Sequence, residues 1–128
     1  MKLLLDTHSF LWFVTSDARL SATALSLIAD ANNDVLLSPA SYWEVAIKVS
    51  LGKYPLTVPF ETFFTTALTR NAIQILAVEV RHAAVLSALP MHHKDPFDRM
   101  IAAQALSESI PVVSVDAALD PYGITRLW

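Results

Sequence analysis

Four carboxylate side chains stand where the sequence could bring them into one site: Asp6, Glu44, Asp98 and Asp116. Three of them follow short apolar runs that are typical of strands, and the fourth, Asp98, lies in the first turn of a predicted helix. In an open parallel α/β sheet, ligand sites form beyond the carboxyl ends of the strands. We therefore expect the four carboxylates to share one crevice.

The chemistry expected of such a cluster depends on cations. Carboxylates held within about 4 to 6 Å raise one another's pKa, so the cluster persists only with protons or cations present. Mg²⁺ and Mn²⁺ prefer carboxylate and water oxygens, and they keep several water molecules in their coordination shells. These properties favour hydrolysis of a phosphodiester by metal-activated water, with the same ion or a second one stabilising the leaving oxygen.

Each acid also has a purely structural alternative. Asp6 could cap the first helix, and Asp116 could open a turn. Asp95 and Asp98 fit the N-cap and N3 positions of a helix, and we assign Asp95 to capping. The residues alone leave capping and metal binding open for the other three.

Glu44 has two structural alternatives of its own. It could complete a capping box with Ser41, or it could pair with Lys48 four residues further on. An exposed helical pair of that kind contributes roughly 0.3 to 0.5 kcal/mol.

The elements that must position these acids alternate between strand and helix. The apolar runs predict strands at residues 2–5, 35–37, 73–78, 112–115 and 124–128. Helical periodicity and start signals predict helices around residues 10–14, 21–31, 38–50, 60–68, 79–88 and 95–109. Because parallel neighbours need long crossover connections, this alternation predicts an α/β domain with a mainly parallel central sheet flanked by helices.

Aromatic and apolar residues recur at helical spacing in the third predicted helix, where Trp43, Ile47 and Leu51 lie four residues apart. Core packing is the expected role of the aromatic residues that recur at helical spacing: Trp12, Tyr42, Trp43, Phe60, Phe63 and Phe64. Hydrophobic residues make up 54% of the chain, however, and so high a fraction could also leave an apolar patch exposed for a partner.

Length and composition exclude several classes of protein. The 128 residues fit one domain, predicted to span residues 1–128. The absence of cysteine excludes disulfides, thiolate zinc sites, iron–sulfur clusters and cysteine nucleophiles. Only two glycines occur, Gly52 and Gly123, so there is no Gly-rich phosphate loop.

Charge and hydropathy bound the surroundings of the protein. The net charge of −3 provides no general basic field for nucleic acid. The apolar run Phe10–Val14 is far shorter than the ~18 residues that a membrane span needs. We expect a cytoplasmic protein with no membrane association.

Four blocks of sequence, in this order, carry a specific resemblance: Leu4–His8, Ser41–Lys48, Leu89–Ala105 with its Asp-Pro-Phe-Asp-Arg pattern, and Ser114–Asp116. Together they resemble the PIN domain and, more narrowly, the VapC-type toxins of bacterial and archaeal toxin–antitoxin pairs. The resemblance runs from Met1 to Trp128 and is least distinctive in the middle helices.

The resemblance implies a PIN-like fold and an endoribonuclease, a hydrolase that depends on Mg²⁺ with Mn²⁺ as a substitute. It implies that Asp6, Glu44 and Asp98 are the core acids, with Asp6 and Asp98 as the best candidates for direct metal ligands. Asp116 matches the fourth, more variable acid. The supporting residues that it implies are the hydroxyls of Ser114 and Thr7.

The implied partners are an RNA substrate, such as transfer or ribosomal RNA, a cognate VapB-type antitoxin and a second copy of the chain in a homodimer. Four side chains that border the site in the sequence are candidates for phosphate contacts: Lys94, Arg99, His92 and His93. The alternative for the two histidines is that they are ordinary solvated loop residues. His8 and His82 have no evident ligand partners in the sequence.

Two other functions remain open at this point. A catalytically silent PIN-like module that binds protein or RNA would need none of the acids. A receiver-like phosphoacceptor domain, which also binds Mg²⁺, needs an acidic pair after the first strand and a lysine after the last core strand. Here Asp6 stands alone and Val115-Asp116-Ala117 occupies the place of the lysine.

Overall fold

Five short strands form one sheet in which every neighbouring pair is parallel. The computed structural model describes residues 1–128 and orders the strands β3-β2-β1-β4-β5. Their bounds are β1 Lys2–Leu5, β2 Asp34–Leu37, β3 Gln74–Ile75, β4 Val112–Val113 and β5 Arg126–Leu127. The expected α/β class with a parallel central sheet is confirmed.

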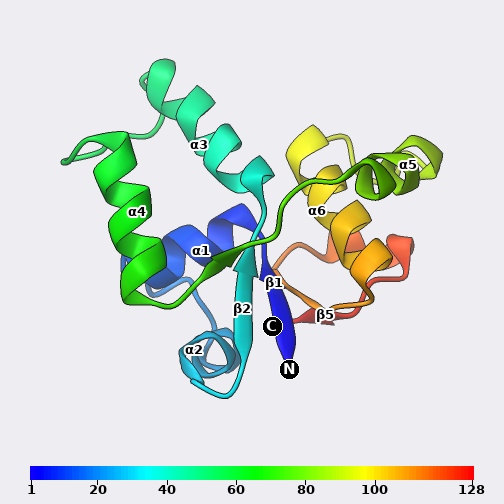
Figure 1. Cartoon of the computed structure of the whole chain (residues 1–128), viewed down its shortest axis with the longest axis horizontal. Helices are drawn as coiled ribbons and strands as arrows, with labels where there is room; N and C mark the ends of the chain where they lie inside the picture. Colours follow the sequence, from blue (N-terminus) through cyan, green and yellow to red (C-terminus); the bar gives the residue numbers. More distant parts are fainter.

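Helices cover both faces of this sheet (Figure 1). They are α1 Thr7–Val14, α2 Ala22–Ala29, α3 Pro39–Ser50, α4 Phe60–Arg70, α5 Val80–Ala88 and α6 Pro96–Glu108, with a 3₁₀ helix η1 at Ala117–Tyr122. In Figure 1, α1, α2 and α4 lie on one side of β1 and β2, and α5 and α6 lie on the other. The segments 3–5 and 35–37 are buried on both faces, as uninterrupted apolar strands of a parallel sheet usually are.

The alternation of side chains along β1 divides the core in two. Leu3 and Leu5 face the cluster that includes Phe10 of α1 and Phe64 of α4. Leu4 faces the opposite cluster, which is built on α6 and η1. Because successive side chains of a strand point to opposite faces, three consecutive leucines join both layers of helices to one central strand.

Local signals in the sequence set the starts of the helices that matter for the site. The Ser38 hydroxyl accepts the Ala40 amide at the start of α3, and Pro39 takes the first helical position. Asp95 and Pro96 play the same two roles for α6. A proline at the first helical turn sacrifices no hydrogen bond, since that amide has no partner within the helix. Gly52 follows α3 with a φ of 70°, a conformation that favours glycine.

Three strands are shorter in the structure than the sequence predicts. Within the predicted ranges 73–78 and 124–128, only two residues each form a strand. These are β3 and β5, the edge strands of the sheet, which pair on one side only. In the run 112–115 the strand pairing ends at Val113, and the side chain of Val115 is 46% exposed. Beyond Val113 the chain turns into η1, because the Ser114 hydroxyl accepts the Asp116 amide.

The stripe of Trp43, Ile47 and Leu51 lies on the surface, and the expectation that Trp43 packs into the core is wrong. The exposed fractions of the three side chains are 62%, 38% and 62%. Helix α3 instead turns Ala40 and Val45 inward. Both sides of α3 are apolar, so spacing alone did not show which of them faces the core. None of the helices is long and apolar enough to cross a membrane.

Candidate active site

Asp6 ends the central strand and begins the first helix. Its side chain is 4% exposed, and its Oδ1 accepts the Ser9 amide at 2.8 Å, which makes it the N-cap of α1. The capping role is therefore real. It occupies only one of the two oxygens, because Oδ2 takes no hydrogen bond from the protein. One carboxylate can thus cap the helix and still offer an oxygen to a cation.

Glu44 lies in the second turn of α3 and is 5% exposed. Its Oε2 accepts the Lys48 ammonium at 2.8 Å, so the predicted pair is formed. The alternative capping box is absent, because Ser38 caps the helix and the Ser41 hydroxyl accepts that of Thr7 at 3.0 Å. Thr7 thereby links α1, which Asp6 caps, to α3, which contains Glu44.

Asp95 and Asp98 share the first turn of α6. The Oδ1 of Asp95 accepts the amides of Phe97 and Asp98, at 2.8 and 3.0 Å, which confirms its assignment to capping. Asp98 is the third residue of the helix. Burial and the negative charges of Asp95, Asp6 and Glu44 together raise the pKa of Asp98 to about 7, although the positive charge of His93 acts in the opposite direction. The charges of Asp6 and Glu44 therefore both act on Asp98.

Asp116 follows β4 and caps η1 by accepting the Ala118 amide at 3.0 Å, so it does open a turn. Ser114 is fully buried, and its hydroxyl fixes the Asp116 amide at 3.0 Å. Burial tends to raise the pKa of Asp116, but hydrogen bonds from Ala118 and from His93 outweigh it, and the pKa is lowered. Asp98 and Asp116 thus differ in the direction of their pKa shifts.

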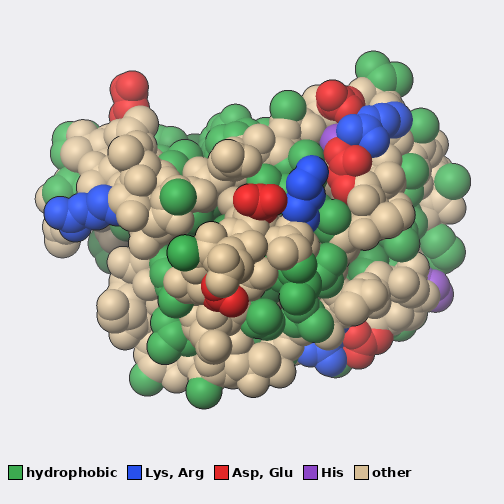
Figure 2. All heavy atoms as spheres, turned by 60° about the horizontal axis from the view of Figure 1, so that its bottom comes forward, with side chains coloured by type: hydrophobic (Ala, Val, Ile, Leu, Met, Phe, Trp, Pro, Cys, Tyr) green, Lys and Arg blue, Asp and Glu red, His purple; other side chains and the backbone are tan.

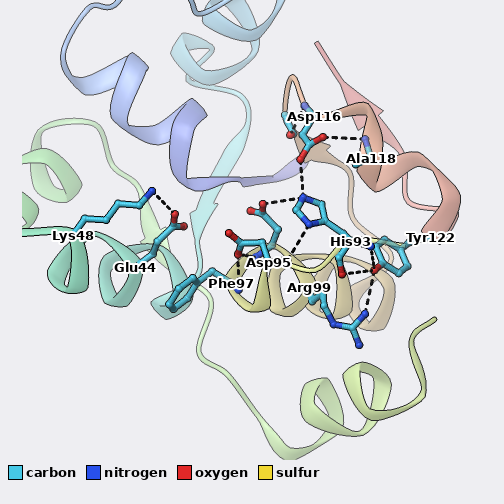
Figure 3. Close-up of polar contacts among 11 residues, drawn as sticks. Glu44, Lys48, His93, Asp95, Phe97, Arg99, Asp116, Ala118 and Tyr122 are labelled. Atoms are coloured by element: carbon cyan, nitrogen blue, oxygen red, sulfur yellow. Dashed lines mark hydrogen bonds and ion pairs between the residues drawn. The ribbon is translucent and has the colours of Figure 1, made fainter. Parts of the chain in front are cut away.

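His93 lies between these two acids, and Figure 3 shows its contact with Asp116. Its Nε2 lies 2.8 Å from Asp116 Oδ2 and 3.2 Å from Asp98 Oδ2. The ligand atoms of all three residues lie within 4.8 Å of one another. The sequence placed His93 beside the site as a phosphate contact or a solvated loop residue, but it did not indicate that the ring lies between two of the acids. The one feature of the sequence that pointed to a place near the acids was its position two residues before Asp95, the cap of α6.

Arg99 is not available to an RNA phosphate, and that expectation is corrected. The side chain is buried, and its guanidinium donates to the carbonyls of Pro90 and Leu89 and to the hydroxyl of Tyr122. It therefore holds the loop of residues 89–94 against α6. By contrast, Lys94 and His92 are exposed on that loop.

A second group of ligand-type side chains lies between α5 and α6 and explains His82. The ring is fully buried; its Nδ1 accepts the Glu79 amide at 3.0 Å, and its Nε2 lies 3.3 Å from Glu108. Arg81 donates two hydrogen bonds to the same Glu108 carboxylate. This group caps α5 and fastens it to α6, away from the four acids.

Basic side chains do not form a continuous surface on the face drawn in Figure 2, where most of them lie beside acidic ones. Ion pairs of this kind join Arg81 to Glu79 and Glu108, and Arg126 to Asp120. Arg126 also donates to the carbonyl of Ser114, which places it behind the Asp116 turn. This pairing agrees with the low net charge of the chain.

One curated relative is Ribonuclease VapC16 of Mycobacterium tuberculosis, which is 36% identical to the chain over 70 residues. The match covers 52% of this chain and 50% of that protein, so the chain spans about half the length of the relative in this comparison.

Solved structures share the fold over nearly the whole length of the chain. VapBC2 from Rickettsia felis, bound to a fragment of promoter DNA, has a TM-score of 0.69 at 15% identity and covers 98% of this chain and 97% of that one. FitAcB from Neisseria gonorrhoeae has a TM-score of 0.68 at 21% identity, with coverages of 97% and 95%. At these identities the likeness shows the fold alone.

The family model of the PIN domain matches residues 3–123, a range that begins in the central strand and ends just after η1. It therefore includes all four acids and every element that positions them. On this match, the chain belongs to the PIN domain family.

Proposed function

We propose that the protein is a metal-dependent endoribonuclease and the toxin of a VapBC-type toxin–antitoxin pair. The observation that carries the proposal is the placement of Asp98, partly buried in the first turn of α6 and near enough to Asp95, Asp6 and Glu44 for their charges to help raise its pKa to about 7. Carboxylates so close are costly to ionise together without a cation. The similarity to Ribonuclease VapC16 supports RNA as the substrate.

The donor set fits Mg²⁺ or Mn²⁺. The available ligand atoms are carboxylate oxygens, which these hard ions prefer, and no thiolate exists in the chain. Asp6 through Oδ2 and Asp98 are the direct ligands in this proposal, with Glu44 and Asp116 completing the acidic site. A divalent ion there offsets the negative charges that hold the pKa of Asp98 high.

The protein's part in hydrolysis is to hold charges in place. When bound, the ion supplies an activated water molecule and a positive charge for the phosphate, so that RNA is left with a 5′-phosphate and a 3′-hydroxyl. Asp6 is fixed by its bond to Ser9, and Glu44 is fixed by Lys48. Lys94 and His92 are exposed beside the site and take the flanking phosphates. No covalent enzyme intermediate is required.

The partners in this proposal are a VapB-type antitoxin and a second copy of the chain. An apolar groove of about 700 Å³ supports such contacts; its lining includes Tyr42 and Trp43 of α3, Leu86 of α5 and Met100 of α6. Trp43 also packs edge-on against Phe97, the residue before Asp98. Several solved structures with this fold are VapBC complexes.

The test is RNA cleavage by metal-stripped protein freed of any antitoxin. Total and transfer RNA are incubated with EDTA, Mg²⁺ or Mn²⁺, and the parent is compared with Asp98→Asn and with Glu61→Gln, which alters an exposed acid in the first turn of α4. We expect cuts that need a metal, that persist in Glu61→Gln and that disappear in folded Asp98→Asn. Absence of cleavage by the folded parent with every RNA and metal would favour the silent binding module.

A further inference from the structure

His93 is held in one orientation by groups outside the acidic cluster. Its backbone amide donates to the Tyr122 hydroxyl at 2.9 Å. That hydroxyl also accepts Arg99 at 3.2 Å and reaches the His93 carbonyl at 3.4 Å. Arg99 in turn holds the carbonyl of Pro90 at 2.9 Å. The loop that carries His93 is therefore held in place by contacts that do not involve the acids.

The hydrogen bonds decide which ring nitrogen carries the hydrogen. The Asp95 amide donates to His93 Nδ1 at 3.1 Å, so Nδ1 must be an acceptor. A neutral imidazole that accepts through one nitrogen donates through the other. The Nε2–H is therefore the group that faces Asp116 and Asp98, at 2.8 and 3.2 Å. The N–H is hydrogen-bonded to Asp116, and the Asp98 carboxylate, from another segment of the chain, lies against the same nitrogen.

This arrangement bears on the role of His93 at a metal. The three side chains are close enough for an ion to touch all of them. A metal-binding Nε2 would have to lose its hydrogen, and Nδ1 would have to take one while facing the Asp95 amide. That would set two N–H donors against each other. The distances alone would allow His93 to be a metal ligand, but the hydrogen bond from the Asp95 amide to Nδ1 argues against that role.

We propose that His93 is a positioning residue, which fixes the carboxylate of Asp116 through its Nε2–H beside that of Asp98 and is not itself a metal ligand. The inference rests on the proposed function, because it assigns a task at the same metal site. It places His93 in the outer shell, where partners fix the orientation of ligating groups. The 16% exposed side chain of His93 fits this supporting place better than a phosphate contact.

The first test is read on the parent protein, and a substitution serves only to assign the signals. Long-range ¹⁵N–¹H NMR spectra of the parent identify the protonated nitrogen of each histidine, and His93→Gln assigns the His93 signals. We expect the hydrogen on Nε2 both in EDTA and with saturating Mg²⁺. A hydrogen on Nδ1 in the metal-free protein, or its loss from Nε2 on addition of Mg²⁺, would overturn the inference.

The second test measures Mn²⁺ binding by electron paramagnetic resonance without RNA. We expect His93→Ala to bind Mn²⁺ about 10- to 100-fold more weakly than the parent. The His93→Gln side chain keeps an N–H donor and should recover most of the loss. The exposed Glu61 in the first turn of α4, changed to Gln, should leave Mn²⁺ affinity unchanged.

The outcomes separate this inference from the proposed function. Parent-like Mn²⁺ affinity in His93→Ala, in a protein whose Asp98→Asn variant loses Mn²⁺, refutes the positioning role alone. Failure of the parent to cut RNA while these Mn²⁺ affinities behave as expected refutes the ribonuclease and leaves the metal site standing.

Discussion

Asp98→Asn should make the metal-free protein more stable at alkaline pH, although it removes a proposed metal ligand. The pKa of Asp98 is about 7 in the folded protein and 3.8 is its usual value. A group whose pKa is raised on folding contributes stability that is fully present below its unfolded pKa and is lost as pH rises through its folded pKa. The parent should therefore lose stability between about pH 4 and pH 7.

The size of the effect follows from the two pKa values. At about 1.4 kcal/mol for each pH unit, the difference corresponds to at most about 4 kcal/mol in the free energy of unfolding. Asparagine cannot ionise, so Asp98→Asn avoids this loss. Its advantage over the parent should be near its minimum at pH 4 and reach its full value by pH 8.

Urea unfolding in EDTA at several pH values measures this difference, and Glu61→Gln serves as the control because its carboxyl is exposed. Addition of Mg²⁺ at pH 8 should stabilise the parent and reduce the advantage of Asp98→Asn, since a ligand that binds the folded state stabilises it. If the free energy of unfolding of the parent and of Asp98→Asn shows the same dependence on pH in EDTA, the pKa of Asp98 is not raised by folding.

Three further substitutions test the structural roles of site residues. Asp6→Asn should leave the free energy of unfolding nearly unchanged, since asparagine caps helices about as well as aspartate, while RNA cleavage is lost; a large loss of stability in urea would contradict the assigned cap. Asp95→Ala should cost about 1 kcal/mol of stability through the lost cap of α6, and calorimetric parity with the parent would show that the cap contributes little. Arg99→Met should destabilise the protein by about 2 kcal/mol or more, because the buried Tyr122 hydroxyl and two partly buried carbonyls lose their donor; hydrogen exchange should speed up in residues 89–94, and unchanged exchange there would contradict the role of Arg99 in holding this loop.

The sequence predicted the parts of the fold that local chemistry determines. An uninterrupted apolar run before Asp6 identified the central strand, and the pairs Ser38-Pro39 and Asp95-Pro96 located the starts of α3 and α6. These signals act within a few residues, through caps and helix starts, so they can be recognised without knowledge of the tertiary structure.

The rest depended on contacts between distant segments. Trp43 and Ile47 have helical spacing, but only the packing of α3 shows that they face outward. Arg99 looked like a phosphate ligand until the carbonyls of residues 89 and 90 were seen to surround it. His93 reaches Asp116 across 23 positions of sequence, and no spacing rule joins the two.

Within the site, the sequence identified the acids but not how they differ. It grouped Asp6, Glu44, Asp98 and Asp116 because each follows a strand or begins a helix. Burial and charge then separate them, so that the pKa of Asp98 rises and that of Asp116 falls. Such differences arise from desolvation and neighbouring charges, which a sequence does not display.

The most direct test of the central claim is a titration of metal-free protein with Mn²⁺ in which bound Mn²⁺ and the rate of RNA cleavage are recorded in the same samples. If the acids hold the ion that enables hydrolysis, both signals should rise together and reach half of their maximum at the same free Mn²⁺ concentration. Cleavage that is already complete in EDTA, or that rises at a Mn²⁺ concentration unrelated to binding, would contradict the account.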